Sequence, residues 1–120
     1  MTKIMPQEIE VWYLLPALRR EIARIFVKDF KTTQKEVAKI FGITEAAVSQ
    51  YMKSKRATKL KFNKQELEKI KKTTSMIFKN KDNFAAYIYD LCAKLRGTKT
   101  LCNLHKKIDK TVPKNCSICK

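Results

Sequence analysis

Four cysteines are the residues of this chain best suited to chemistry, and all of them lie in its last 29 residues. Their spacing is C-x9-C-x13-C-x2-C, formed by Cys92, Cys102, Cys116 and Cys119. A C-x2-C pair chelates one metal through a tight turn, and two further thiolates complete the tetrahedral coordination that zinc prefers. Four thiolates also suit an iron–sulfur cubane, with one ligand for each iron. The spacing therefore favours a metal or cluster site and leaves zinc and iron–sulfur both open.

Other interpretations of these residues remain. Cys102-x2-His105 followed by C-x2-C is a plausible zinc site that does not need Cys92, and Cys92 could then be a buried thiol on an apolar helix face. A redox dithiol normally sits at a helix start in a thioredoxin-like α/β fold, which this sequence does not predict. The chain has one His, no Gly-rich phosphate loop and no evident acid–base pair. We therefore expect no enzyme.

Upstream of the cysteines, residues 34–56 (QKEVAKIFGITEAAVSQYMKSKR) predict two short helices joined by a tight turn. Gly42 supplies the positive φ that such a turn requires. Ala38 is small enough for the helices to approach closely, and Val48 supplies an apolar contact from the second helix to the first. Thr44 is a good N-cap for the second helix. The combination fits a helix-turn-helix, in which the second helix carries the base contacts.

This stretch resembles the helix-turn-helix of the Cro/phage-repressor (XRE) family. The resemblance implies that Gln34 contacts phosphate, and that the residues facing the DNA groove are Glu45, Ala46, Ser49, Gln50 and Lys53. The start of the second helix at Thr44 and the basic exit at Lys55 and Arg56 complete the expected DNA-binding set. The alternative is a pair of packed helices joined by a glycine turn that has no role in DNA binding.

The segments around this motif predict amphipathic helices. Pro6 and Glu8 suit a helix start, and Pro16 is expected to break that first segment and to open a new helix. Trp12 and Tyr13 are expected to fill the core, with packing across a two-fold axis as the alternative.

The helices that follow are bounded by local signals. Thr33 with Glu36 predicts a capping box at the start of the first motif helix. Further helices are expected over 64–79 and from Phe84 to Leu95, with Gly97 as a C-cap. From Thr98 onward we expect a cysteine-rich tail. The sequence has little strand signal, although a brief hairpin near 57–63 is an alternative.

Charge is abundant and unevenly distributed. The formal net charge is +16 over 120 residues. Residues 1–52 contain eight Lys/Arg and six acids, 53–81 contain eleven and two, and 94–120 contain eight and one. Such an excess predicts attraction to a polyanion and salt-sensitive binding. No apolar run is long enough to span a bilayer and no signal peptide is evident, so we expect a cytoplasmic protein with no membrane partner.

The chain as a whole resembles a family of small archaeal helix-turn-helix regulators. The resemblance is carried by MPQEIEVWYLLPALRREIA, by ITEAAVSQYMKSKRA, and by the Leu-Cys pairs at 91–92 and 101–102 with His105 and the final CSIC. It implies a dimeric DNA-binding protein whose cysteines hold a [4Fe-4S] cluster, with Cys92, Cys102, Cys116 and Cys119 as ligands.

The expected fold is therefore all-α, with two parts. Residues 1–81 form a helix-turn-helix DNA-binding domain, and residues 82–120 form a helix with a short cysteine-rich, metal- or cluster-stabilised tail. The expected function is a sequence-specific, homodimeric transcriptional regulator on a palindromic operator, tuned by its cluster. A DNA-binding regulator with a structural Zn²⁺ site is one alternative, and a basic RNA-binding module is another.

Overall fold

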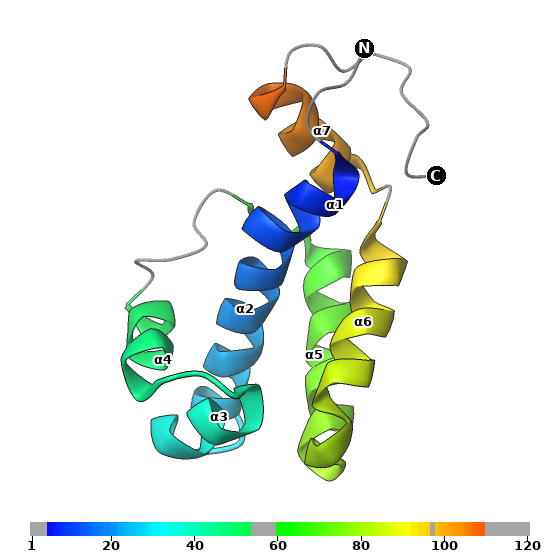
Figure 1. The fold of residues 1–120 in the computed structure, drawn as a ribbon. Helices are drawn as coiled ribbons and strands as arrows, with labels where there is room; N and C mark the ends of the chain where they lie inside the picture. The colour runs from blue at the N-terminus through cyan, green and yellow to red at the C-terminus, as the bar shows by residue number, and fades with distance from the viewer. Residues whose placement is uncertain (1–4, 54–59, 97, 110–120) are drawn as a thin grey trace.

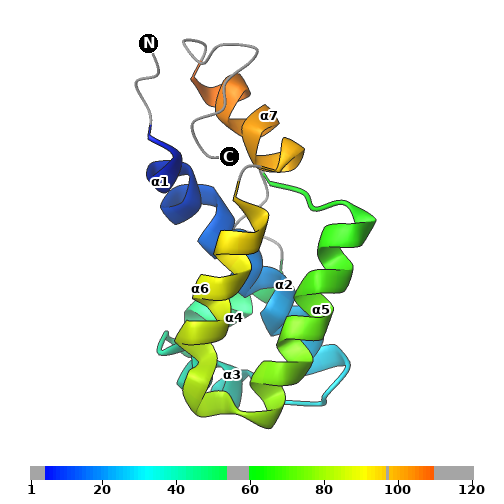
Figure 2. The same ribbon diagram turned by 90° about the vertical axis from the view of Figure 1, so that its right-hand side faces the viewer.

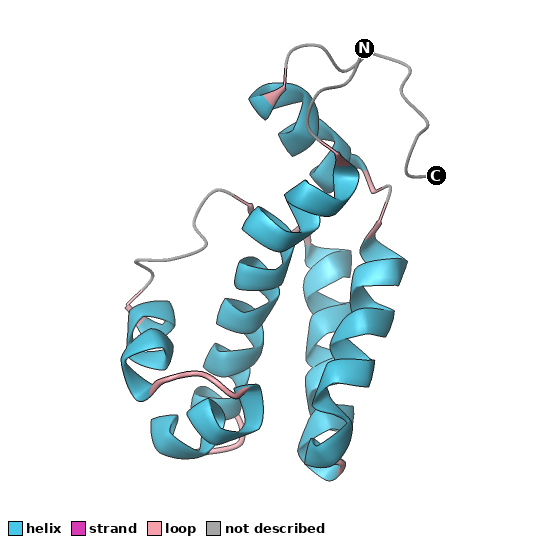
Figure 3. Ribbon diagram, in the orientation of Figure 1, coloured by secondary structure: helices cyan, strands magenta, loops and turns pink. Residues whose placement is uncertain are grey.

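The protein is all-α throughout the residues that the computed structural model describes, namely 5–53, 60–96 and 98–109 (Figures 1 and 3). No strand occurs within these ranges, which confirms the all-α prediction. The elements in chain order are α1 (Pro6–Ile9), the π-helix η1 (Glu10–Leu14), α2 (Leu15–Lys28), α3 (Gln34–Phe41), α4 (Glu45–Met52), α5 (Lys64–Lys79), the 3₁₀-helix η2 (Lys81–Asn83), α6 (Phe84–Leu95) and α7 (Lys99–Ile108). No helix among these residues is long and apolar enough to cross a membrane.

The first helices form one continuous helical stretch, contrary to the predicted break at Pro16. The turn before this proline widens to a π-helix, in which the Leu15 N–H donates to the Glu10 carbonyl five residues earlier. Pro16 then occupies the first turn of α2, directly after the widened turn. A π-turn absorbs the conflict between a proline ring and the preceding helical turn, so the chain changes pitch and does not break.

The helix α2 is the centre of the fold. It packs against α3 and α4 on one side and against α5 on the other, and α6 packs along α5 (Figures 1 and 2). The helix α7 lies at one end of the molecule, next to α1. The two helices of residues 34–56 are therefore held on one flank of a helical framework.

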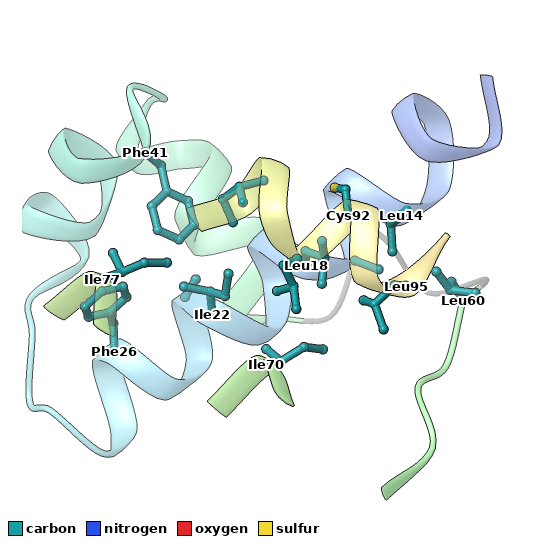
Figure 4. Packing of buried hydrophobic residues seen from close by; sticks show 14 of the residues in the cluster. Leu14, Leu18, Ile22, Phe26, Phe41, Leu60, Ile70, Ile77, Cys92 and Leu95 are labelled. Atoms are coloured by element: carbon teal, nitrogen blue, oxygen red, sulfur yellow. The ribbon is translucent and has the colours of Figure 1, made fainter. Parts of the chain in front are cut away.

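The core runs along α2. Four fully buried side chains, Leu14 of η1 and Leu18, Ile22 and Phe26 of α2, meet buried side chains from α3, α5 and α6 (Figure 4). At the end near α3 the core is aromatic, because the Phe26 ring lies about 6 Å from the rings of Phe30, Phe41 and Phe78. Aromatic pairs at such separations stabilise beyond the area that they bury.

One of the two aromatic residues of η1 differs from the sequence prediction. Tyr13 is half-buried against the core, as expected, whereas Trp12 is 53 % exposed. Successive side chains of a helix point in different directions, and Leu14 is the η1 residue that enters the core. The prediction of Trp12 as a core residue was wrong.

The beginning of the expected tail is a helix. Residues Lys99–Ile108 form α7, which buries Leu101, Leu104 and His105. Its first turn is tied to α5, because the Thr100 hydroxyl donates to Glu66 Oε1 at 2.9 Å. Glu66 also closes a capping box with Asn63 at the start of α5. This helix was not predicted, although Leu101, Leu104 and Ile108 recur at helical spacing.

Candidate DNA-binding unit and cysteine site

The turn between α3 and α4 has the predicted geometry. Gly42 has φ +68° in the left-handed region, and its N–H donates to the Ala38 carbonyl, as does the Ile43 N–H at 3.0 Å. A Cβ added at Gly42 would meet nothing within 4 Å. Glycine is therefore favoured here by the positive φ alone, and not by crowding.

Each helix of the unit begins at a threonine cap. The Thr33 Oγ1 accepts from the Glu36 N–H at 3.2 Å, and the Thr44 Oγ1 accepts from the Ala47 N–H at 3.1 Å. Both caps were predicted. The capping box predicted at Thr33 and Glu36 is only half formed, because among the described residues the Glu36 carboxylate does not return a bond to the Thr33 N–H. At the start of each helix, one backbone N–H is therefore hydrogen-bonded to a threonine side chain, which fixes the residue at which the helix begins.

The inner face of the unit is buried against α2 and against itself. Val37, Ala38 and Phe41 of α3 are buried, as are Val48 and Tyr51 of α4. Ala38 and Val48 thus have the packing roles expected from the sequence. Because the caps, the turn and this face fix both helices, the opposite face of α4 has a defined orientation.

The outer face contains the residues predicted to meet DNA. Glu45, Ala46 and Lys53 are exposed, whereas Ser49 and Gln50 are half-buried. They recur at i, i+1, i+4, i+5 and i+8, which is one side of an α-helix. Gln34 and Thr44 are also exposed, and the Thr44 hydroxyl serves as the cap.

Lys55 and Arg56 lie outside the described residues. Lys35, exposed next to Gln34 in the first turn of α3, is a further cation on this unit that the sequence analysis did not select. Its position beside the predicted phosphate contact could have indicated it.

Cys92 lies on the buried face of α6 and is 6 % exposed (Figure 4). Burial and, to a lesser extent, the carboxylate of Glu10 raise the pKa of its thiol from 9.0 to about 11, while Arg96 and Arg19 oppose the shift. In the chain without a metal this thiol is therefore protonated at neutral pH. A bound metal ion would displace the proton, because the cation stabilises the thiolate.

An ion pair next to Cys92 joins η1 to the end of α6. The Arg96 Nε donates to Glu10 Oε1 at 2.6 Å, and Nη2 lies 3.5 Å from Oε2. The hydrogen bond that Arg96 donates to the Glu10 carboxylate raises the pKa of Arg96. This bidentate contact links η1 to the residue that follows α6.

Two of the other predicted ligands, Cys102 and His105, lie in α7. Cys102 is partly exposed in this helix, and His105 is buried one turn later. Cys92 and Cys102 thus lie on either side of the short connection between α6 and α7. Cys116 and Cys119 lie outside the described residues, as does the predicted C-cap Gly97. Within the described ranges, no three His, Cys, Asp or Glu residues are grouped as metal ligands.

Comparisons of the chain with protein-family models, with curated proteins and with solved structures found no match.

Proposed function

We propose that this protein is a cytoplasmic, sequence-specific DNA-binding transcriptional regulator that places α4 in the major groove. The observation that supports this best is the division of α4 into two faces. One face is buried through Val48 and Tyr51, and the other presents polar side chains on a unit fixed by two caps and a left-handed glycine. A recognition helix needs this combination of a rigid mount and a free polar face.

The proposed roles follow from side-chain chemistry. Gln50 and Ser49 read base edges, with the Gln50 amide suited to adenine, while Glu45 accepts from cytosine N4. The Ala46 methyl suits contact with thymine. Lys53 contacts phosphate and contributes affinity without sequence information. Gln34 has the same positioning role, and Lys55 and Arg56 extend the basic exit.

We further propose a homodimer on a palindromic operator, in which a second copy covers the exposed apolar residues of the first segment. Met5, Val11 and Trp12 are 49, 57 and 53 % exposed. Residues 5–18 contain two glutamates and no Lys or Arg, in a chain of net charge +16. A second, equally basic copy can approach this segment with less repulsion than it meets elsewhere, whereas a polyanion is not attracted to it.

A [4Fe-4S] cluster held by Cys92, Cys102, Cys116 and Cys119 is the cofactor that we propose. When bound it would supply a redox-sensitive cross-link between α6, α7 and the end of the chain. The two described cysteines suit this set, because they flank one short connection and Cys102 is accessible. The alternative is a structural Zn²⁺ site, with His105 replacing Cys92.

The chain's own contacts offer a route from this site to α4. Arg96 fixes the end of α6 to Glu10, and Thr100 fixes α7 to Glu66 at the start of α5. Both η1 and α5 pack against α2, which in turn carries α4. A change at the cysteines therefore reaches α4 through contiguous packed helices.

Selection of bound duplexes from a random-sequence pool tests the DNA-binding proposal. The expected result is an enriched, two-fold symmetric site. Gln50→Ala should weaken binding to that site by about tenfold or more, which is the cost of one lost bidentate base contact, and nonspecific binding should change little. The matched control is Gln65→Ala, because Gln65 is exposed on α5, away from α4. Equal, sequence-blind binding of duplex DNA and structured RNA would favour the basic RNA-binding module.

Anaerobic purification followed by iron, zinc and sulfide analysis tests the cofactor. A cluster predicts brown protein with about four iron and four sulfide per chain. Cys92→Ser separates the two candidate sites, because it should remove the cluster but leave a zinc site that uses His105. Full metal retention by Cys116→Ser would contradict both.

A further inference from the structure

The basic segment 53–81 adjoins α4 in the sequence, but much of it lies elsewhere in the fold. Sixteen of its residues form α5, and α2 lies between α5 and α4 (Figures 1 and 2). Each of these two helices packs directly against α2. The positive charge of α5 therefore does not surround the proposed recognition helix, and it needs an explanation of its own.

The solvent face of α5 is a row of lysines. The helix turns Ile70, Thr74 and Ile77 into the core, and on the opposite side it exposes Lys64, Lys71, Lys72 and Lys79. We call these four residues the α5 lysine face. Glu68 is the only acid that α5 exposes, because its other acid, Glu66, is buried in the capping box.

The lysine face is not neutralised within the described part of the chain. None of its ammonium groups forms an ion pair there, although Glu68 is four residues from both Lys64 and Lys72. On α6, by contrast, Asp90 and Lys94 do form such an i,i+4 pair, at 3.0 Å. An unpaired cation row along a rigid helix is a surface to which a polyanion can bind.

The shape of this surface favours duplex DNA among the polyanions. The centre of the apolar side of α5 is buried in the core through Ile70 and Ile77, and only Leu67, Met76 and Phe78 remain partly exposed at its edges. This leaves α5 no broad apolar face with which to insert into a lipid interface, as amphipathic membrane helices do.

Phe78 is the one aromatic residue of α5 and is 38 % exposed, but its ring stacks on Phe30 at 4.5 Å and lies under the Lys81 ammonium group. It therefore offers little free ring surface on which unpaired bases could stack. The exposed ammonium groups instead suit the phosphates of a duplex, because contacts with phosphate need no stacking on the bases.

The two proposed DNA-facing surfaces lie on helices that α2 separates. Two successive helix-packing distances place the axes of α4 and α5 roughly 16–20 Å apart, and Figure 1 shows α2 between them. The lysine face is therefore not an extension of the surface that α4 presents.

We propose that the α5 lysine face binds a second segment of duplex DNA while α4 holds the first, so that the protein bridges two segments. This inference rests on the proposed function of α4.

A two-duplex capture experiment on the full-length protein tests the bridge. A biotinylated duplex of about three helical turns is fixed to beads, protein is added, and retention of a second, fluorescent duplex is measured. Wild-type protein should retain the second duplex. Lys71→Gln/Lys72→Gln should lower that retention by about tenfold and lower its salt slope by about 2, because two phosphate contacts are lost. Its binding to a single duplex at low protein concentration should change by less than about threefold.

The matched control is Lys99→Gln/Lys107→Gln, which removes two exposed lysines from α7 and leaves the same net charge. It should bridge like the wild type. Glutamine keeps helix propensity, and an unchanged circular dichroism spectrum verifies folding of both variants. If the wild type binds one duplex but captures no second, or if the α5 variant bridges normally or no worse than the control, the bridge is refuted and the proposed function of α4 stands. If the wild type binds no duplex at all, both fail.

Discussion

Replacing Gly42 with alanine isolates the energetic role of the turn that orients α4. The backbone at this position has φ +68°, and an added Cβ would contact no atom within 4 Å. The substitution therefore introduces no clash and deletes no side-chain contact. What remains is the intrinsic cost of placing an L-residue in the left-handed region, which is about 1–2 kcal/mol.

That cost can be converted into a melting temperature. The entropy of unfolding is about 2.1 cal/mol/K per residue, or roughly 0.25 kcal/mol/K for 120 residues. A loss of about 1–2 kcal/mol then lowers Tm by about 4–8 °C. Asparagine tolerates the left-handed region better than alanine does, so Gly42→Asn should lower Tm by less than half as much.

Thermal unfolding by circular dichroism and urea titration, with cofactor occupancy held equal, measure these differences. The urea midpoint should fall with an unchanged m-value, because the same surface is exposed on unfolding. If Gly42→Ala were as stable as the wild type, the left-handed turn would be absent or energetically irrelevant. If Gly42→Asn and Gly42→Ala were equally destabilised, the cost would come from crowding, contrary to the open space around this position.

Three other predictions concern the interface, the groove face and the buried thiol. Trp12→Ala should raise the dimer dissociation constant about a hundredfold or more, because burying the exposed half of an indole contributes about 3 kcal/mol per protomer. Tyr89→Ala, at an exposed aromatic of α6, should leave the dimer intact in sedimentation. A Trp12→Ala protein that stays dimeric would refute the interface. Glu45→Gln should tighten nonspecific duplex binding by roughly threefold or more, because it removes a carboxylate that repels phosphate. It should also reduce discrimination among selected sites, because the carboxylate no longer accepts from cytosine. Weaker nonspecific binding in filter assays would show that Glu45 does not lie at the DNA. In the metal-free protein the pKa of Cys92 is raised to about 11, so the unfolded chain loses this proton first and stability falls as pH rises from about 9 to about 11. Urea titrations at about pH 8 and about pH 10 should show a smaller fall for Cys92→Val, and an equal fall would place the thiol in solvent.

Short-range physics in the sequence determined much of the proposed site. The caps at Thr33 and Thr44 and the left-handed turn at Gly42 each depend on a few neighbouring residues, so they could be predicted one position at a time. The same holds for α5, whose bounds match the predicted 64–79 and whose Asn63 cap is local. The outer face of α4 followed from helical spacing alone.

Tertiary structure decided where these elements lie relative to one another. The sequence places the lysines of α5 directly after α4, but packing on opposite sides of α2 separates the two surfaces. Trp12 and Leu14 are both apolar and lie two residues apart in η1. Leu14 is buried and Trp12 is exposed because of where the surrounding helices lie. The contacts Arg96–Glu10 and Thr100–Glu66 join residues 86 and 34 positions apart. Periodicity states which residues share a face, whereas the partner that covers a face depends on contacts between distant parts of the chain.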